Sequence, residues 1–288
     1  MNTASHLQER VAENYADLSA KLREAADFVV ANQIDVAARS LRSVSSSSGV
    51  SPATLSRLAR VLGFESYEDL RELCRTTVSG HGLSFSERAD RLKKDANATS
   101  SILEQQSAAC MHNISKMCEE LDRSRLQSAV GAMADARSVV LFGAFGSTGI
   151  VEYMAYLANY FSTNWTLAGR MGASLGASLA SMKPQDVLLI VTKAPYASRA
   201  MLAAEAASKR GASVIVISDS HACPAIKHAK FPFIVPSESP QFFSSYTATL
   251  TLMETMVAML VAQTGELASE RIRDVEAQNK CLGDFWTD

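Results

Sequence analysis

The chain has 288 residues, a formal net charge of −2, and 47% hydrophobic and 20% charged residues. This length predicts two domains, and the composition excludes a disordered or fibrous protein because it is able to bury an ordinary core. The near-neutral charge excludes recognition of a polyanion by overall attraction, so such a partner would require a local basic patch.

The five cysteines are widely spaced, and no pair has the close spacing of a zinc site. We therefore expect free thiols in a reducing cytoplasm, with no metal and no other cofactor. No apolar run precedes a cleavage site near the N-terminus. The most apolar long stretch, Thr249–Ala262, is too short for a membrane span and contains Glu254. We expect a cytoplasmic protein without a membrane partner.

The first eighty residues are predicted to be helical. Apolar side chains recur from Leu18 to Val29 at steps of three and four residues, which is typical of a buried helix face. Further along, Gly49 predicts a tight turn. Ser51 suits the N-cap of the next helix, and Gly63 suits its C-terminal end. With Pro52 in the first helical position, this helix is predicted to run from Pro52 to about Leu62.

The two faces of this predicted helix differ in chemistry. Leu55, Leu58 and Leu62 share an apolar face, whereas the opposite face carries small residues and arginines. Small residues allow a helix to enter the major groove, where arginine reaches a guanine edge or a phosphate. The predicted DNA contacts are Ser51, Ala53, Thr54, Ser56, Arg57 and Arg60. The alternatives are a helical hairpin with a solvated basic face, and a serine tract at Ser45–Ser48 that is only a linker.

The stretch Gly49–Phe64 (Gly-Val-Ser-Pro-Ala-Thr-Leu-Ser-Arg-Leu-Ala-Arg-Val-Leu-Gly-Phe) resembles the recognition helix of the RpiR family of bacterial transcription regulators. Leu18–Asn32 resembles the first helix of that family. Ser45–Ser48 depart from the helix-forming residues usual there, which predicts an intrinsically weak helix. The resemblance implies binding to a double-stranded DNA operator by a homodimer or tetramer.

A change of pattern divides the chain. Gly80 and Gly82, within Ser79–Ser86, predict a hinge, and the helical pattern then returns until Ala134. We predict a helix-turn-helix DNA-binding domain at 1–80, a hinge and connecting helices at 81–134, and an effector-binding domain at 135–288.

The C-terminal part is predicted to be an α/β domain. Short apolar runs bounded by Gly, Pro, Ser or Asp alternate with helical stretches, which predicts a parallel sheet covered on both faces. The five predicted strands are Ser138–Phe142, Trp165–Leu167, Asp186–Val191, Ser213–Ile217 and Phe231–Val235. The fold class is therefore an all-α domain followed by a five-stranded parallel sheet flanked by helices.

Two loops that follow predicted strands favour an anion site. A strand, a Gly-rich turn and a helix start present backbone N–H groups and a helix dipole to an anion. At a switch point of a parallel sheet, the carboxyl ends of neighbouring strands form the ligand crevice. The predicted effector-binding residues are Gly143, Gly146, Ser147, Thr148, Thr192, Lys193, Tyr196 and Ser198. Ser198 is also a candidate cap of the following helix. Ser244 and Ser245 are candidates to close the same pocket. Routine strand-to-helix turns are the alternative.

Ser138–Gln263 resembles the sugar isomerase (SIS) domain, the effector sensor of the RpiR family. The Gly143–Ser147 turn is similar to its first phosphate loop, and Ser218-Asp219-Ser220 is similar to its Thr-Asp-Ser turn. The usual Ser-x-Ser-Gly-x-Thr loop is altered here, and only Thr192 keeps its hydroxyl. The resemblance implies a sensor of a phosphorylated sugar or related anionic metabolite, with Lys193 or Arg199 replacing lost donors, although the altered loop also suits a carboxylate.

No catalytic residue is predicted. An isomerase requires a placed general base, whereas Glu152 and Glu205 are expected inside helices, and His221 and His228 in a solvated loop. The main alternative is an SIS-type sugar-phosphate isomerase with an appended helical domain, and a third is a binding module without DNA activity. Self-association is expected through the Thr249–Ala262 helix, or that helix packs in the core. Its apolar residues are Leu250, Met253, Met256, Val257 and Leu260.

Overall fold

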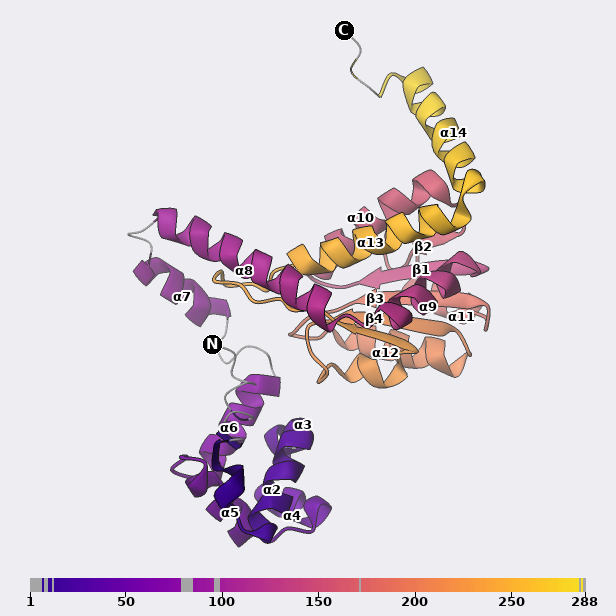
Figure 1. Cartoon of the computed structure of the whole chain (residues 1–288). Helices are drawn as coiled ribbons and strands as arrows, with labels where there is room; N and C mark the ends of the chain where they lie inside the picture. The colour runs from indigo at the N-terminus through magenta and orange to yellow at the C-terminus, as the bar shows by residue number, and fades with distance from the viewer. Residues whose placement is uncertain are drawn as a thin grey trace. The chain divides into compact units, whose positions relative to one another are not determined.

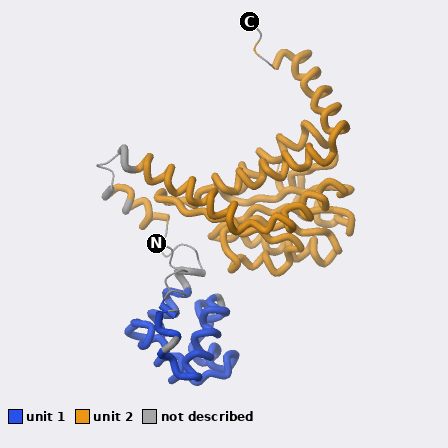
Figure 2. Tube along the Cα trace, in the orientation of Figure 1, with its two compact units in different colours: residues 1–84 blue, residues 85–288 orange. Residues whose placement is uncertain are grey.

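The computed structural model describes residues 7, 10, 11, 13–78, 85–95, 99–170, 172–284 and 286. It divides into two compact units, Met1–Ser84 and Phe85–Asp288, which Figure 2 shows in different colours. The predicted hinge at Gly80–Gly82 lies outside the described residues. Helices and strands are numbered as in Figure 1.

Unit 1 is helical, as predicted. Its elements are a 3-10 turn at Tyr15–Asp17 and the helices α2 (Ala20–Ala31), α3 (Gln33–Ala38), α4 (Leu41–Ser48), α5 (Pro52–Val61) and α6 (Tyr67–Val78). The apolar face of α2 is buried against that of α5, with Leu22, Val29, Leu55 and Leu58 in one cluster. The helical periodicity read from the sequence therefore forms the core of this unit.

The serine tract is helical rather than a linker, because α4 extends through Ser48. Ser40 caps this helix by accepting the backbone N–H of Ser43 at 3.3 Å, and the hydroxyl of Ser47 donates to the Ser43 carbonyl at 3.0 Å. Gly49 ends α4 with φ 69°, a left-handed conformation that glycine adopts at little cost. Caps at both ends thus support a sequence of low helix propensity.

Unit 2 contains a five-stranded parallel sheet, as predicted. The sheet order is β2-β1-β3-β4-β5. Its strands are β1 (Ser138–Gly143), β2 (Trp165–Leu167), β3 (Asp186–Val191), β4 (Ser213–Ser218) and β5 (Phe231–Ile234). Its helices are α7 (Phe85–Asp95), α8 (Thr99–Glu120), α9 (Arg123–Ala134), α10 (Ser147–Phe161), α11 (Leu175–Ser181), α12 (Ser198–Lys209), α13 (Thr247–Thr264) and α14 (Glu266–Leu282), with a 3-10 helix η2 at Pro224–His228.

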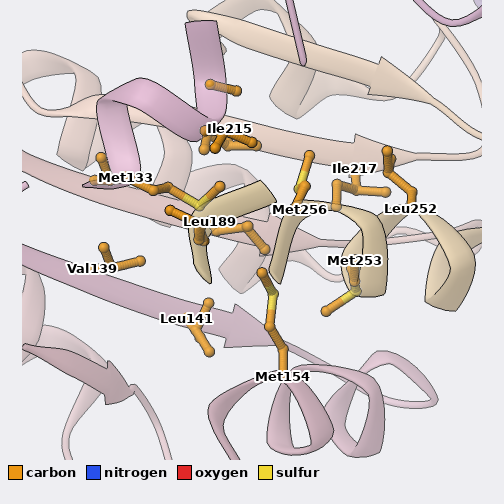
Figure 3. Close-up of a cluster of buried hydrophobic side chains, with 14 of the residues drawn as sticks. Met133, Val139, Leu141, Met154, Leu189, Ile215, Ile217, Leu252, Met253 and Met256 are labelled. Carbon is orange, nitrogen blue, oxygen red and sulfur yellow. The ribbon is translucent and has the colours of Figure 1, made fainter. Parts of the chain in front are cut away.

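Helices cover both faces of this sheet. Figure 1 shows α10 and α13 on one side and α12 on the other. Alternate residues of each strand point to opposite faces, so Leu141 and Leu189 join the cluster under α10 and α13. Phe142 and Ile190 join the cluster under α12. Figure 3 shows the first cluster, where methionines of α9, α10 and α13 fill the space above the strands.

The self-association hypothesis for α13 needs a correction. Met253, Met256 and Leu260 are almost fully buried within the chain itself, so they belong to the core and are not available to a second copy. Leu250 and Val257 are partly exposed. The all-apolar pattern of α13 reflects burial against α8, α9 and α10 rather than an interface.

The structure also bears on the predictions about cysteines, metal ions and membrane spans. The five cysteines are free thiols, as predicted. Across the described ranges there is no group of three or more His, Cys, Asp or Glu side chains that could hold a metal ion. None of the described helices is both long and apolar enough to cross a membrane.

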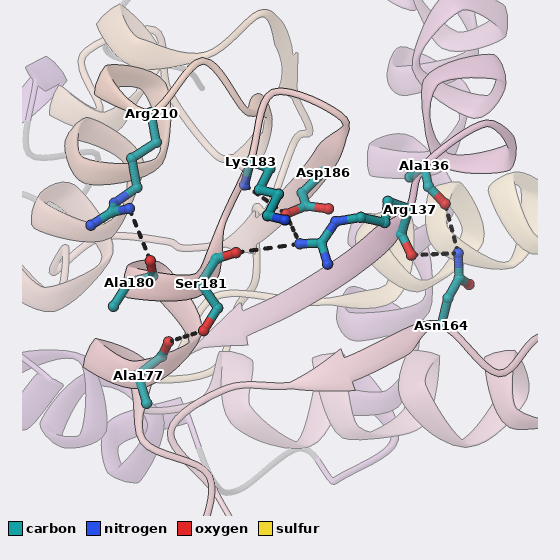
Figure 4. A network of polar contacts seen from close by, with 9 residues as sticks. All are labelled: Ala136, Arg137, Asn164, Ala177, Ala180, Ser181, Lys183, Asp186 and Arg210. Carbon is teal, nitrogen blue, oxygen red and sulfur yellow. Dashed lines mark hydrogen bonds and ion pairs between the residues drawn. The ribbon is translucent and has the colours of Figure 1, made fainter.

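A polar network fixes the start of β3 at the amino-terminal edge of the sheet (Figure 4). The Asp186 side chain is 1% exposed, and its Oδ2 accepts from the Arg137 guanidinium at 2.6 Å and from the backbone N–H of Lys183 at 2.7 Å. The same Nη2 of Arg137 also donates to the Ser181 carbonyl at 3.3 Å. Together these bonds join the beginnings of β1 and β3 to the end of α11.

Replacing Asp186 with Ala should destabilise unit 2 by about 1–3 kcal/mol, because the Lys183 N–H and Arg137 lose their acceptor. Urea unfolding followed by the fluorescence of Trp165, which is buried in the same unit, measures this loss. Asp186→Asn keeps one acceptor oxygen and should lose less. Equal stability of Asp186→Ala and the wild type would contradict this role.

Candidate anion-binding site

The carboxyl ends of β1 and β3 lie side by side, with Gly143 opposite Val191 in the parallel register. The chain runs outward from this pair of strands in both directions, since β2 lies beyond β1, and β4 and β5 lie beyond β3. This is the topological switch point of the sheet, the position at which open α/β sheets commonly bind their ligands. Both predicted anion loops begin here.

The glycines of the first loop are explained by contacts with the chain itself. A Cβ on Gly143 would lie 2.5 Å from the Ser147 carbonyl oxygen, and a Cβ on Gly146 would lie 2.9 Å from the Phe243 ring. The N–H groups of Ser147 and Thr148 donate to the carbonyls of Ala144 and Phe145, both at 3.1 Å. The sequence predicted a backbone cradle for an anion, whereas these glycines admit close packing and these two donors close the turn.

Ser147 begins α10, and its side chain points into the interior. It is 1% exposed, and its Oγ lies 2.9 Å from the hydroxyl oxygen of Tyr246, the residue immediately before α13. Burial raises the pKa of the Tyr246 hydroxyl, whereas its hydrogen bond with Ser147 lowers it in part. Two neutral hydroxyls therefore meet at the carboxyl end of β1.

Lys193, two residues after β3, is the unusual group of this site. It is 6% exposed, and its Nζ has no hydrogen-bond partner among the described residues. The Nζ lies 5.1 Å from the centroid of the Tyr246 ring, within the range of a cation–π contact. Burial lowers the pKa of Lys193 to about 8, and the nearby Asp219 carboxylate opposes part of that shift. An ammonium with three unused donors is thus held beside the Ser147–Tyr246 pair.

Asp219, directly after β4, holds the loop that carries Lys193. Its Oδ2 accepts the backbone N–H of Ala194 at 3.1 Å, and its Oδ1 accepts the Tyr196 hydroxyl at 3.2 Å. Burial is the largest cause that raises the pKa of Tyr196, so this hydroxyl stays a donor. Asp219 was noted in the sequence only for its resemblance to a family turn, and the structure gives it this loop-fixing contact.

The other predicted residues of the second loop lie as follows. Thr192 is buried next to Lys193, and its N–H donates to Ile217 at 3.0 Å, which continues the strand pairing. Tyr196 was predicted to bind the effector, but its hydroxyl donates to Asp219 instead. The expected cap by Ser198 is wrong, since Ala197 occupies the N-cap position and Ser198 is the exposed first residue of α12. Ser198 therefore lacks the non-helical position from which a side chain caps.

Two polar side chains of this region were missed in the sequence. Tyr246 contacts both Ser147 and Lys193, although 99 positions separate it from Ser147. Thr249 lies one helical turn further along α13, and its buried Oγ1 has no hydrogen-bond partner within the described part of the chain. The serine cluster before α13 was the only sequence signal nearby. Ser244 and Ser245 are buried, and Ser245 bonds to Thr247 at 3.1 Å.

In unit 1, the predicted DNA-contacting residues lie on or just before α5. Ser51 caps this helix by accepting the N–H of Thr54 at 3.2 Å, and the two hydroxyl oxygens are 2.8 Å apart. Ala53, Arg57 and Arg60 are exposed, and Thr54 and Ser56 are partly exposed. The leucines of the opposite face are buried. α5 therefore presents a small, basic and solvent-facing surface.

Comparison with known proteins identifies the α/β unit. Residues 132–259 match the family model of the SIS domain. Residues 132–259 of the C-terminal unit therefore form an SIS domain. The match starts within α9, includes all five strands and both candidate loops, and ends within α13. The candidate site therefore lies within the residues that match the family model.

Solved structures share this fold and its arrangement. The sugar isomerase domain of an RpiR transcription factor from Sphaerobacter thermophilus is 19% identical, with a TM-score of 0.58, and the match covers 61% of this chain and 98% of that one. The Vibrio vulnificus NanR protein, complexed with ManNAc-6P, is 18% identical, with a TM-score of 0.58 and coverage of 96% of this chain and 98% of that one. The NanR match extends over both units, so the predicted fold class, a helical unit followed by an SIS domain, is confirmed.

Replacing Lys193 with Met should stabilise the ligand-free protein by roughly 2–3 kcal/mol at neutral pH, because an unpaired ammonium no longer has to be buried. Below about pH 8 the lysine is charged in both the folded and the unfolded chain, so its desolvation cost is fully present. The cost fades as the pH rises toward the ordinary lysine pKa of 10.5, and the advantage of Met should shrink with it.

Denaturant unfolding of the two proteins between about pH 7 and pH 10 measures this difference. Lys183→Met, at a site where the side chain is exposed, is the matched control and should change stability little. A less stable Lys193→Met protein would show that Lys193 has a structural partner and would contradict the proposed role.

Proposed function

We propose that this chain is a DNA-binding transcription regulator whose SIS domain senses a phosphorylated sugar or a related anionic metabolite. The observation that carries the proposal is the buried Lys193 ammonium, which has no hydrogen-bond partner among the described residues and lies beside the Ser147–Tyr246 pair. Burying an unpaired charge is costly, and an anion that pairs with it recovers much of that cost. A bound anion is therefore the best explanation for a buried ammonium without a partner at this position.

The chemistry of the donors favours a phosphate group. Lys193 supplies a charge and three N–H donors, and the hydroxyls of Ser147 and Tyr246 can turn their hydrogens outward. Charge-assisted bonds of this kind are about twice as strong as neutral ones. Thr192 and Thr148 are further candidates at the same edge of the sheet. The sugar phosphate bound to NanR supports this ligand class for a protein of the same fold.

The DNA-binding part of the proposal rests on α5. Its N-terminal residues are small and exposed, and Arg57 and Arg60 extend from the solvent-facing side. A helix of this kind reads bases with its N-terminal residues while arginines hold phosphates. The regulators of similar fold support this assignment. Because one helix reads a short site, we expect a homodimer or tetramer to bind half-sites about one helical turn, or a multiple, apart.

An SIS-type isomerase is the second candidate, because sugar phosphates are substrates as well as signals. Asp219 is a carboxylate next to the cluster, but its two oxygens accept the Ala194 N–H and the Tyr196 hydroxyl, which makes it a poor general base. Incubation with aldose and ketose phosphates, followed by chromatography, separates the two functions. Turnover of a sugar phosphate would favour the enzyme, and a gel shift of the upstream DNA would favour the regulator over a simple binding module.

Arg57→Ala should weaken binding to the specific DNA site by about 1–3 kcal/mol if Arg57 contacts a base edge. Fluorescence anisotropy with a labelled fragment from upstream of the gene measures the affinity at fixed salt. Lys21→Ala removes an exposed positive charge from α2 and is the matched control, with little expected change. Normal operator binding by a folded Arg57→Ala protein would contradict the assignment of α5 as the helix that reads DNA.

Ser147→Ala should reduce the affinity for a sugar phosphate by about ten- to a hundredfold, since a hydrogen bond to a charged group contributes roughly 1.5–3 kcal/mol. A thermal-shift screen of sugar phosphates, sugar acids and neutral sugars finds the ligand, and calorimetry gives its Kd. Ser128→Ala, an exposed serine of α9, is the control. Equal stabilisation by neutral sugars and anions, or an unchanged Kd in Ser147→Ala, would rule out the anion site.

A further inference from the structure

Residues 235–246, between β5 and α13, form a cover segment over the candidate anion site. Its last residue, Tyr246, makes the hydrogen bond to Ser147 and lies beside Lys193. Phe243 lies close enough to Gly146 that even a Cβ at that position would collide with its ring. The rings of Phe243 and Tyr246 are stacked, with centroids 6.5 Å apart and an interplanar angle of 20°. The cover segment therefore contacts the site through two coupled aromatic side chains.

The same segment is held by α8 through paired polar contacts. Asn113 is fully buried, and its Nδ2 donates to the Glu238 carbonyl at 2.7 Å while its Oδ1 accepts the Glu238 N–H at 3.1 Å. Two helical turns earlier, Gln106 accepts a bond from the Ser239 hydroxyl at 3.2 Å. A buried amide that satisfies both backbone groups of one residue fixes that residue to the helix, because breaking either bond leaves a buried polar group unpaired.

A second contact reaches the cover segment from α7. Phe85 is the first residue of α7 and the first residue of unit 2 in the chain. Its ring centroid lies 5.0 Å from that of Phe243 and 6.4 Å from that of Phe242. A continuous row of rings therefore leads from Phe85 through Phe243 to Tyr246 and the Ser147 hydroxyl.

We propose that Asn113 and Phe85 are positioning residues that couple occupancy of the anion site to α7 and α8, the two helices that follow the N-terminal unit in the chain. This inference rests on the proposed function. An anion that takes donors from both hydroxyls breaks the bond between Ser147 and Tyr246, and this releases the Tyr246 ring from its attachment to α10. Phe243 is stacked on that ring, and the cover segment is bonded to α8, so the change is passed to both helices. A ligand that prefers one arrangement of them shifts the population toward it.

The test uses the full chain and inorganic phosphate as the first probe, followed by the best sugar phosphate of the screen. Calorimetry gives the Kd, and amide hydrogen exchange reports on α7 and α8 with and without saturating probe. In the wild type we expect amide exchange in α7 and α8 to change by about threefold or more. Asn113→Ala should keep a Kd within a few-fold of the wild type and lose most of the response in α8.

Two further variants keep the result interpretable. Phe85→Ala changes an exposed side chain, should fold normally, and should lose the response in α7 while keeping that in α8. Met111→Ala, an exposed position two residues before Asn113, should leave both responses intact. Phosphate binding without any change in α7 or α8, or a full response in Asn113→Ala and Phe85→Ala, overturns the coupling alone. Absence of binding for every anion overturns the proposed function and the coupling with it.

Discussion

The candidate site depends on one buried charge. Lys193 places an ammonium in the interior of the SIS domain, beside a tyrosine ring and two hydroxyls, where the described residues give it no hydrogen-bond partner. A protein interior seldom keeps such a group, because its desolvation is repaid only by a close and well-bonded partner. The surrounding structure nevertheless fixes it in place through Asp219, which holds the backbone at Ala194. A residue that lowers the stability of the fold, yet is held in place by its surroundings, is typical of a binding site.

The fold supplies this position from general features of parallel sheets. Reversal of the winding direction between β1 and β3 separates the loops that follow them, and the N-terminus of α13 enters the gap with Tyr246. The site is thus built from β1, β3, β4 and the start of α13. Because the cover segment that ends in Tyr246 is also bonded to α8, the element that completes the site is shared with the connecting helices.

Much of the architecture was predictable because it depends on local sequence patterns of apolar and capping residues. Short runs that are apolar throughout gave all five strands to within a residue at each end, and the capping residues Ser51 and Gly63 placed α5. The site was predictable only in part. Ser147 and Lys193 follow strands and could be assigned to one edge of the sheet, whereas Tyr246 comes from a distant segment whose docking depends on tertiary packing. Gly146 suggested a backbone cradle, but the same residue also permits close approach of Phe243, and sequence does not distinguish the two.

Proton uptake on ligand binding tests the central claim most directly. At about pH 8.5 a sugar phosphate is already a dianion, while Lys193, with its pKa of about 8, is mostly neutral in the free protein. Binding of the anion should therefore draw a large fraction of a proton onto Lys193, which calorimetry in buffers of different ionisation enthalpy detects. We expect proton uptake on anion binding in the wild type and its loss in Lys193→Met. Tight binding of the anion with no proton uptake, or undiminished binding by Lys193→Met, would contradict it.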